Sequence, residues 1–298
     1  MRQSNHVDPE PLLVRRLRYR LWDMFRPSYS VQAGPRTLHV RATSWAASRL
    51  PAGWPSTWRV DLMRRVFALR PGAFVDVGAN TGQTLIDFVL SGEKRPYFGF
   101  EPNPECIEML NTLIDANRLE NVMMAPVGLA DADMILKFFV KRNSTADKGG
   151  SLMAGLRPDN DLRSLLVPCY RFDTVREQLG VDDISLIKID VEGAELATLS
   201  GMRETIAAEK PWIALEVLHR DSAADVNAHD RRTDALLALI AELGYAVFLL
   251  DKPHDEGCVN GLTRVEDFPR IAWTPQNKHL CDYMLVPEAD AEQAAQLF

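Results

Sequence analysis

The residues in this chain that are best suited to chemistry are carboxylates at the ends of short apolar segments. Asp76 lies within the segment 74–77, which the loop Gly-Ala-Asn-Thr-Gly follows at 78–82. A second segment, 97–100, ends at Glu101. Glycines allow a tight turn and a close approach of the backbone to a ligand, and ligands bind at the carboxyl ends of strands in doubly wound sheets. We therefore expect a nucleotide-type binding corner here, with Thr81 capping the helix that follows.

The spacing and charge of this loop indicate which nucleotide it accepts. A dinucleotide site requires Gly-x-Gly-x-x-Gly, whereas the two glycines here are Gly78 and Gly82. Asp76 would repel a diphosphate but suits the ammonium and sulfonium of S-adenosylmethionine. Glu101 has the position of the acidic residue that accepts hydrogen bonds from ribose hydroxyls in Rossmann-like folds. Asn103 is expected to cap the next helix, with Pro104 in its first turn.

Two later segments offer groups for acid–base work. The apolar segment 184–189 ends at Asp190, and Glu192 follows two residues later. The segment 212–218 contains Glu216 and is followed by His219. An acid in so apolar a strand is costly unless it pairs with a cation, a hydroxyl or a metal. The sequence therefore predicts a polar site at the same sheet edge as the glycine loop.

Three motifs in this order resemble the FkbM family of S-adenosylmethionine-dependent methyltransferases. They are Asp-Val-Gly-Ala-Asn-Thr-Gly at 76–82, Phe-Glu-Pro-Asn-Pro at 100–104 and Leu-Ile-Lys-Ile-Asp-Val-Glu-Gly-Ala-Glu at 186–195. The resemblance covers roughly residues 70–220, with a closing strand near 281–286. It implies a Rossmann-like class I methyltransferase sheet and methyl transfer to hydroxyl groups of sugars, glycans or secondary metabolites. In methyltransferases the loop after the third strand flanks the adenine, which adds Asp131 or a backbone amide near Gly128 to the candidates.

The predicted site residues form two groups. The cofactor-binding candidates are Asp76, Gly78, Ala79, Asn80, Gly82, Glu101, Asn103 and Asp131. The candidates for the base that removes the hydroxyl proton, or that orients the acceptor, are Asp190, His219 and Glu216. His219 has the best intrinsic pKa for a base, whereas Asp190 has the better position.

Two alternatives to simple O-methyl transfer remain open. In the first, Asp190 with Glu192 or Glu216 binds magnesium, which lowers the pKa of the hydroxyl. In the second, the protein keeps cofactor binding but serves as a non-catalytic scaffold at a membrane. Loss of activity with a chelator would select the first, and cofactor binding without turnover would support the second.

The pattern of elements predicts an α/β fold with one large domain. We expect an N-terminal basic extension over residues 1–57, irregular from 26, and a methyltransferase domain over 58–298. Its sheet should be mostly parallel, with the last strand at 282–286 antiparallel between its neighbours. Residues 141–168 are expected to form a substrate-facing lid, and 251–280 a rim loop. Asp173 is expected to cap a helix over 174–179.

Charge is distributed unevenly along the chain. Residues 1–70 hold thirteen arginines, no lysine and four acidic residues, a formal charge of +9, and the remainder carries −16. An acidic catalytic domain argues against nucleic acid as substrate. Residues 11–25 can form a basic amphipathic helix, which we expect to pack on its own acidic domain. The alternative is peripheral contact with the inner membrane face.

Targeting signals and cysteine spacing indicate the cellular compartment. The longest apolar runs fall far short of the ~20 residues that cross a bilayer, and no signal peptide is recognisable. The four cysteines are scattered without metal-ligand or disulfide spacing. We therefore expect a cytoplasmic protein with reduced, mostly packed thiols, and no metal site from cysteine or histidine.

Overall fold

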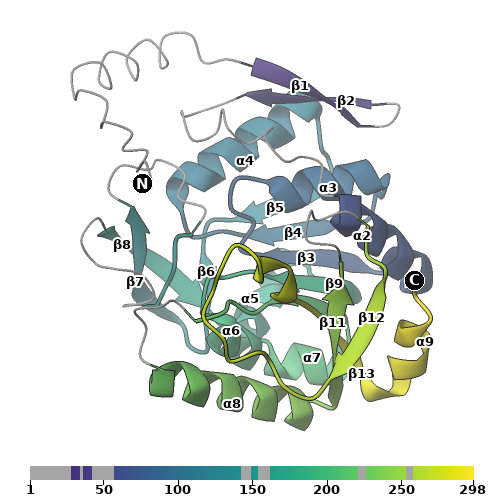
Figure 1. Cartoon of the computed structure of the whole chain (residues 1–298). Coiled ribbons are helices and arrows are strands. Elements are labelled where there is room, and N and C mark those ends of the chain that lie inside the picture. Colours follow the sequence, from purple (N-terminus) through teal and green to yellow (C-terminus); the bar gives the residue numbers. More distant parts are fainter. Residues whose placement is uncertain are drawn as a thin grey trace, which may run out of the picture.

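The computed structural model describes residues 28–33, 36–41, 57–141, 149–153, 162–220, 226–252 and 258–298. Its centre is an eight-stranded sheet in the order β12-β11-β13-β10-β9-β3-β4-β5 (Figure 1). The strands are β3 (Ala73–Val77), β4 (Tyr97–Phe100), β5 (Val122–Ala125), β9 (Ile184–Ile189), β10 (Trp212–Glu216), β11 (Tyr245–Asp251), β12 (Gly261–Val265) and β13 (Asp282–Pro287).

The parallel part of the sheet runs from β10 through β9, β3 and β4 to β5. Strand β13 lies antiparallel between β10 and β11. This arrangement confirms the predicted Rossmann-like sheet with an antiparallel last strand. It also brings the carboxyl ends of β3, β4, β9 and β10 to one edge, where the site lies.

Helices cover both faces of the sheet (Figure 1). One apolar cluster joins the sheet to α2 (Thr57–Leu69), α3 (Gln83–Ser91), α4 (Pro104–Asn117) and α9 (Ala291–Ala295). The other joins it to α5 (Phe172–Leu179), α6 (Glu195–Gly201), α7 (Arg203–Glu209) and α8 (Val226–Glu242). Strand β3 is buried along its whole length, and its apolar side chains alternate: Phe74 packs into the first cluster, Val75 and Val77 into the second.

Two small sheets extend the central one. A three-stranded sheet is formed by β6 (Gly128–Leu129), β8 (Leu162–Tyr170) and β7 (Met134–Lys141). An antiparallel pair is formed by β1 (Ser28–Ala33) and β2 (Arg36–Arg41), and β2 packs against α4.

Four sequence-based expectations about elements were wrong. Residues 26–57 were expected to be irregular but contain β1 and β2. The expected lid over 141–168 contains most of β8, which pairs with β7 over eight residues. The expected rim loop over 251–280 contains β12. The sequence also predicts a helix over 232–243, but α8 begins at Val226, six residues earlier. In each case pairing or packing with a distant segment defines the element, and the local sequence pattern does not reveal it.

None of the helices in the described part of the chain is long and apolar enough to cross a bilayer. The predicted basic helix over residues 11–25 lies outside the described residues, and so does most of the proposed extension 1–57. Three of the four cysteines, Cys106, Cys169 and Cys281, are buried and Cys258 is exposed, in line with mostly packed thiols.

Candidate functional site

The first of two adjoining cavities lies where the glycine loop follows β3. It encloses about 540 Å³, including its open mouth. Among its lining residues are Gly78, Asn80, Glu101, Gly128 and Asp190. A short segment, 149–153, contributes Gly150 and Leu152 to the wall, and the Ser151 hydroxyl donates to the Glu192 carbonyl at 2.6 Å. Part of the expected lid thus lies against the same cavity as the glycine loop.

Gly78 has to be a glycine for two reasons. Its φ is +80°, and a Cβ on it would lie 1.9 Å from the carbonyl oxygen of Asp190. Its N–H donates to Phe100 O at 2.9 Å, and the Asp190 N–H donates to Val77 O at 3.1 Å. The glycine loop is therefore fastened to the ends of both β4 and β9, and any side chain at position 78 would separate them.

Glu101 is held by backbone amides on both sides of its carboxyl group. The Asn80 N–H donates to Oε2 and the Asn103 N–H donates to Oε1, each at 2.8 Å. Burial raises the pKa of Glu101 to about 7, although these two hydrogen bonds act in the opposite direction. Each carboxylate oxygen keeps a further lone pair that a ligand's hydroxyl group can use.

Asp76 does not line this cavity. Its side chain lies on the opposite face of β3 from Val77, and it is fully buried. One carboxylate oxygen accepts a short hydrogen bond from the Tyr97 hydroxyl, and the other lies 3.2 Å from the Lys188 ammonium. The expected direct contact between Asp76 and a cationic ligand is corrected to a buried support beneath the glycine loop.

Lys188 connects Asp76 to the rest of the site. Its ammonium donates to the Gly78 carbonyl oxygen at 2.9 Å and lies 3.4 Å from Asp190 Oδ2. The charge of this lysine is retained because, although burial disfavours it, Asp190 and Asp76 raise its pKa. One cation therefore joins the glycine loop, the strand β3 and the end of β9.

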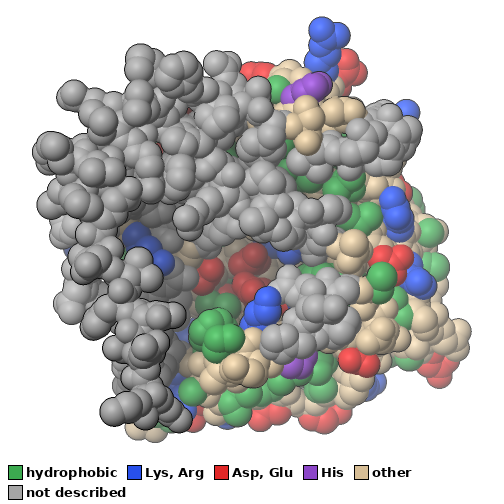
Figure 2. Space-filling model, turned by 45° about the horizontal axis from the view of Figure 1, so that its top comes forward, with side chains coloured by type: hydrophobic (Ala, Val, Ile, Leu, Met, Phe, Trp, Pro, Cys, Tyr) green, Lys and Arg blue, Asp and Glu red, His purple; other side chains and the backbone are tan. Residues whose placement is uncertain are grey.

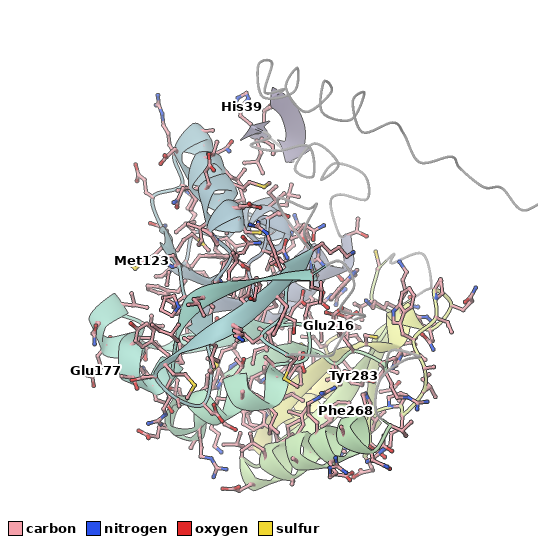
Figure 3. The ribbon with its side chains drawn as sticks, turned by 90° about the vertical axis from the view of Figure 1, so that its left-hand side faces the viewer. His39, Met123, Glu177, Glu216, Phe268 and Tyr283 are labelled. Carbon is pink, nitrogen blue, oxygen red and sulfur yellow. The ribbon has the colours of Figure 1, made fainter. Side chains whose placement is uncertain are left out.

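Asp190 and Glu216 form a carboxyl pair. Burial opposes ionisation of Asp190, but the Lys188 ammonium and a hydrogen bond from Glu216 outweigh it and lower the pKa of Asp190. Burial and the Asp190 charge raise the pKa of Glu216 well above its ordinary value. Glu216 is thus the protonated member, which donates to an ionised Asp190. Glu216, labelled in Figure 3, is half-buried, and its register partner on β13 is Asp282.

The second cavity also encloses about 540 Å³ and lies against the α2 face of the sheet. Asp190 lines both cavities, and Glu216, Lys188, Arg59 and Asp282 line the second. Figure 2 shows acidic side chains in a hollow on one face of the molecule, with basic side chains beside them. The two cavities therefore meet at a carboxylate.

His219 lies elsewhere. It is buried and lines a third cavity together with residues of α8, and it lines neither of the two cavities that share Asp190. Its Nε2 lies 3.1 Å from the Asn277 carbonyl oxygen. Burial lowers its pKa. The expected pairing of His219 with Asp190 is therefore wrong. The His219 side chain contacts Asn277, in the segment after β12, instead.

The other predicted cofactor residues, Ala79, Gly82, Asn103 and Asp131, do not line the cavity. The Ala79 N–H donates to Phe100 O at 3.1 Å, and the Asn103 side chain caps α4 as expected, accepting from Glu105 N–H at 3.1 Å. Gly82 has φ +92° and is itself the N-cap of α3, so the expectation that Thr81 caps this helix was wrong. Asp131 is exposed, whereas Gly128, the alternative candidate near it, lines the cavity together with Leu129.

Asp173 was assigned to the wrong helix. Its carboxylate accepts from the Glu204 and Thr205 N–H groups at 3.0 Å each, and from the Thr205 hydroxyl at 2.6 Å. It therefore caps α7, whereas Arg171 is the N-cap of α5. No sequence pattern links positions 31 residues apart, so this role could be found only from the fold.

Sequence reasoning singled out neither Lys188, Arg59 nor Asp282 as site residues. Lys188 carried a signal, since a lysine inside the apolar strand 184–189 must find a carboxylate when buried. Arg59 and Asp282 lie in a helix and a strand with no motif around them. Within the described ranges, no group of three or more His, Cys, Asp or Glu side chains is arranged to hold a metal ion.

Comparisons with known proteins cover the part of the chain that carries this site. A family model described as the Methyltransferase FkbM domain matches residues 76–247. The 2-O-methyltransferase NoeI of Sinorhizobium fredii is 25% identical over 142 residues, which are 44% of this chain and 58% of NoeI. The AMB antimetabolite synthetase AmbE of Pseudomonas aeruginosa is 30% identical over 210 residues, which are 60% of this chain and 10% of AmbE. The chain thus spans less than two thirds of either relative.

Among solved structures, the methyltransferase FkbM from Methylobacillus flagellatus aligns with 72% of this chain and 43% of its own, at 18% identity and a TM-score of 0.42. Fibrillarin from Aeropyrum pernix, solved with bound S-adenosylmethionine, covers 87% of this chain at 10% identity and a TM-score of 0.38.

Proposed function

Because the chain belongs to the FkbM methyltransferase family, we propose that it transfers a methyl group from S-adenosylmethionine to a hydroxyl oxygen of a sugar, glycan or secondary metabolite. The family match includes the glycine loop, Glu101, Asp190 and Glu216. Transfer to oxygen is further supported by the carboxyl pair Asp190–Glu216, since a hydroxyl group must lose a proton. The name of the relative NoeI, a 2-O-methyltransferase, points to the same atom.

The first cavity suits S-adenosylmethionine. Glu101 would accept hydrogen bonds from the ribose hydroxyls, and Gly78 and Asn80 would bring the backbone close to the ligand. Apolar side chains of Val127, Leu129, Phe138 and Leu152 line the same cavity and would cover a purine ring. When bound, the cofactor supplies an electrophilic methyl group. Asp190 stands between this cavity and the second one.

Removal of the acceptor's proton is assigned to Asp190. Lys188, 3.4 Å away, and the hydrogen bond from Glu216 keep Asp190 ionised. An ionised carboxylate at the boundary of the two cavities can accept the hydroxyl proton and hold the oxygen in line for displacement. Glu216 already carries a proton and acts by holding Asp190 in place.

The observation that carries the proposal is the meeting of two cavities at Asp190. A methyltransferase brings cofactor and acceptor together in line, and a proton acceptor at their meeting point can remove the hydroxyl proton. The second cavity shares Asp190 with the first, whereas the third cavity shares no lining residue with the first. No specific observation favours the magnesium-assisted alternative or the non-catalytic scaffold.

The proposal also covers where the enzyme acts and what it binds. We infer a cytoplasmic enzyme that acts on a small molecule or glycan and not on nucleic acid, with peripheral membrane contact through residues 11–25 as the alternative. Deletion of residues 1–26 should leave cofactor affinity intact. Sedimentation with acidic liposomes before and after the deletion tests the membrane contact, which is wrong if neither form binds.

The function is tested by incubating the full chain with methyl-labelled S-adenosylmethionine and a panel of hydroxylated glycosides and metabolites. Product analysis by carbon NMR should find label in a methoxy group. Chelator should leave the rate unchanged. Label on nitrogen or carbon would contradict O-methyl transfer, and activity that requires magnesium would favour the metal-assisted alternative.

A further inference from the structure

The second cavity has the chemistry of a binding site in its own right. It is formed by helix α2 and by strands β9, β10, β11 and β13. Its volume of about 540 Å³ falls within the range of small-molecule sites. Trp58, Leu250 and Tyr283 contribute apolar wall, and Arg59, Lys188, Asp190, Glu216 and Asp282 contribute polar groups. Apolar wall with a few convergent polar groups is the usual composition of a site for a small molecule.

Each basic side chain that lines this cavity, among the residues described, already contacts a carboxylate. Arg59 Nε lies 2.7 Å from Asp87 Oδ2, and that carboxylate is fully buried. Lys188 lies 3.2 Å from Asp76 and 3.4 Å from Asp190. Each of these two positive charges is therefore already offset by at least one carboxylate.

The acidic side chains of the cavity are paired as well, but together with Asp76 and Asp87 they outnumber the cations Arg59, Lys188 and Lys252. Asp282 forms a short ion pair with Lys252, whose ammonium also lies 4.2 Å from the centre of the Trp58 ring. Asp190 is ionised, and Glu216 is protonated. Their oxygens can accept hydrogen bonds from hydroxyl groups, and the protonated carboxyl can donate one. An anionic ligand would instead face carboxylates after losing its water.

We propose that the second cavity is the acceptor site and that it selects an uncharged, hydroxyl-bearing ring, such as an unmodified sugar, over one carrying a carboxylate or phosphate. The hydroxyls of such a ring bind to Asp190, Glu216 and Asp282, and its C–H faces pack on the apolar wall that includes Trp58. This inference rests on the proposed function for the identification of the cavity as the acceptor site. Its charge selectivity can be measured without turnover.

The test measures binding of two matched rings to the full chain loaded with S-adenosylhomocysteine. The probes are methyl α-D-glucopyranoside and methyl α-D-glucuronide, and saturation-transfer NMR titration gives their affinities. The neutral glucoside should bind at least about tenfold more tightly than the glucuronide. Equal affinities, tighter binding of the glucuronide, or no binding of either ring would overturn the proposal. So would displacement of the glucoside by S-adenosylhomocysteine, because the two must be bound together.

Charge variants make the assignment specific to this cavity. Asp282→Asn leaves the Lys252 ammonium without its carboxylate and should reduce the preference for the neutral ring by roughly tenfold. The double variant Asp282→Asn with Lys252→Met removes both charges and should restore the preference. A matched control is Glu242→Gln, which breaks the exposed pair with Arg203 away from the cavity and should change nothing.

The outcomes separate this inference from the proposed function. If Asp282→Asn leaves the preference unchanged while S-adenosylhomocysteine affinity and melting temperature show a folded protein, the selectivity does not come from this cavity. Should the variant fail to fold, the two probes on the unmodified chain still decide the matter. If the neutral ring binds selectively but no methyl is ever transferred, the proposed function fails while the selectivity stands.

Discussion

Substitution of Glu101 by glutamine tests the cofactor site where the structure is most explicit. The carboxylate accepts one backbone N–H on each oxygen, from Asn80 and from Asn103, at 2.8 Å. Glutamine keeps one acceptor oxygen and replaces the other by an amino group, which faces an N–H donor and repels it. It also removes the charge that would strengthen hydrogen bonds from two ribose hydroxyls.

The expected loss follows from these contacts. A hydrogen bond to a charged group contributes roughly 1.5–3 kcal/mol, and part of this is retained by the remaining oxygen. We therefore expect Glu101→Gln to weaken cofactor binding by about 1–3 kcal/mol, which is roughly 5- to 150-fold in Kd. Asp131→Asn is the matched control, because Asp131 is exposed and does not line the cavity.

The pH dependence gives a second, independent readout. In the free protein burial raises the pKa of Glu101 to about 7, and ribose hydroxyls would favour the ionised form. Binding therefore lowers that pKa, so cofactor affinity is full above pH 7 and falls as the pH drops through 7. Glu101→Gln should abolish this dependence. The assay is isothermal titration with S-adenosylhomocysteine between pH 6 and 8.5, with melting curves to establish folding.

The reasoning is refuted if folded Glu101→Gln binds S-adenosylhomocysteine as tightly as the unmodified chain at pH 8. It is also refuted if the affinity of the unmodified chain does not change between pH 8.5 and 6. Either result would mean that Glu101 contacts only the backbone of Asn80 and Asn103.

Three further variants test the support of the site. Lys188→Met removes the ammonium that lies 3.4 Å from Asp190, so the pKa of Asp190 should rise. The acidic limb of the pH–rate profile should then move upward by roughly 1–3 pH units, and Lys188→Arg should move it less. A limb that does not move would exclude this coupling. His219→Gln should leave the pH–rate profile unchanged because His219 lines a separate cavity, and disappearance of an acidic limb would restore it as the base. Asp173→Ala should lower the free energy of unfolding by about 1–2 kcal/mol through loss of the α7 cap, measured by urea denaturation, without change in S-adenosylhomocysteine affinity.

The fold could be predicted from sequence where local pattern and tertiary structure agree. The glycine loop and the antiparallel last strand were predicted because apolar runs and glycines mark them directly. Strands β1, β2, β8 and β12 were missed, because each is defined by pairing with another strand that the local sequence pattern does not identify. A strand with polar residues cannot be recognised without its neighbour.

The site shows a similar division. Glu101 and Asp190 follow the ends of strands, where position along the chain fixes position at the sheet edge. Asp76 is one residue inside a strand, and since successive side chains alternate between faces, it lies opposite Val77 and away from the cavity. His219 lies three residues beyond β10, where the chain no longer has a regular direction. Its orientation depends on a contact with Asn277 that no local pattern encodes.

The central claim is that Asp190 removes the proton from an acceptor hydroxyl as the methyl group is transferred. Its most direct test is the single-turnover rate of Asp190→Asn with labelled S-adenosylmethionine and a neutral glycoside acceptor identified in the panel. We predict a loss on the order of 10²–10⁴ in rate with cofactor affinity retained. A folded Asp190→Asn variant that methylates the glycoside at the unmodified rate would contradict the account.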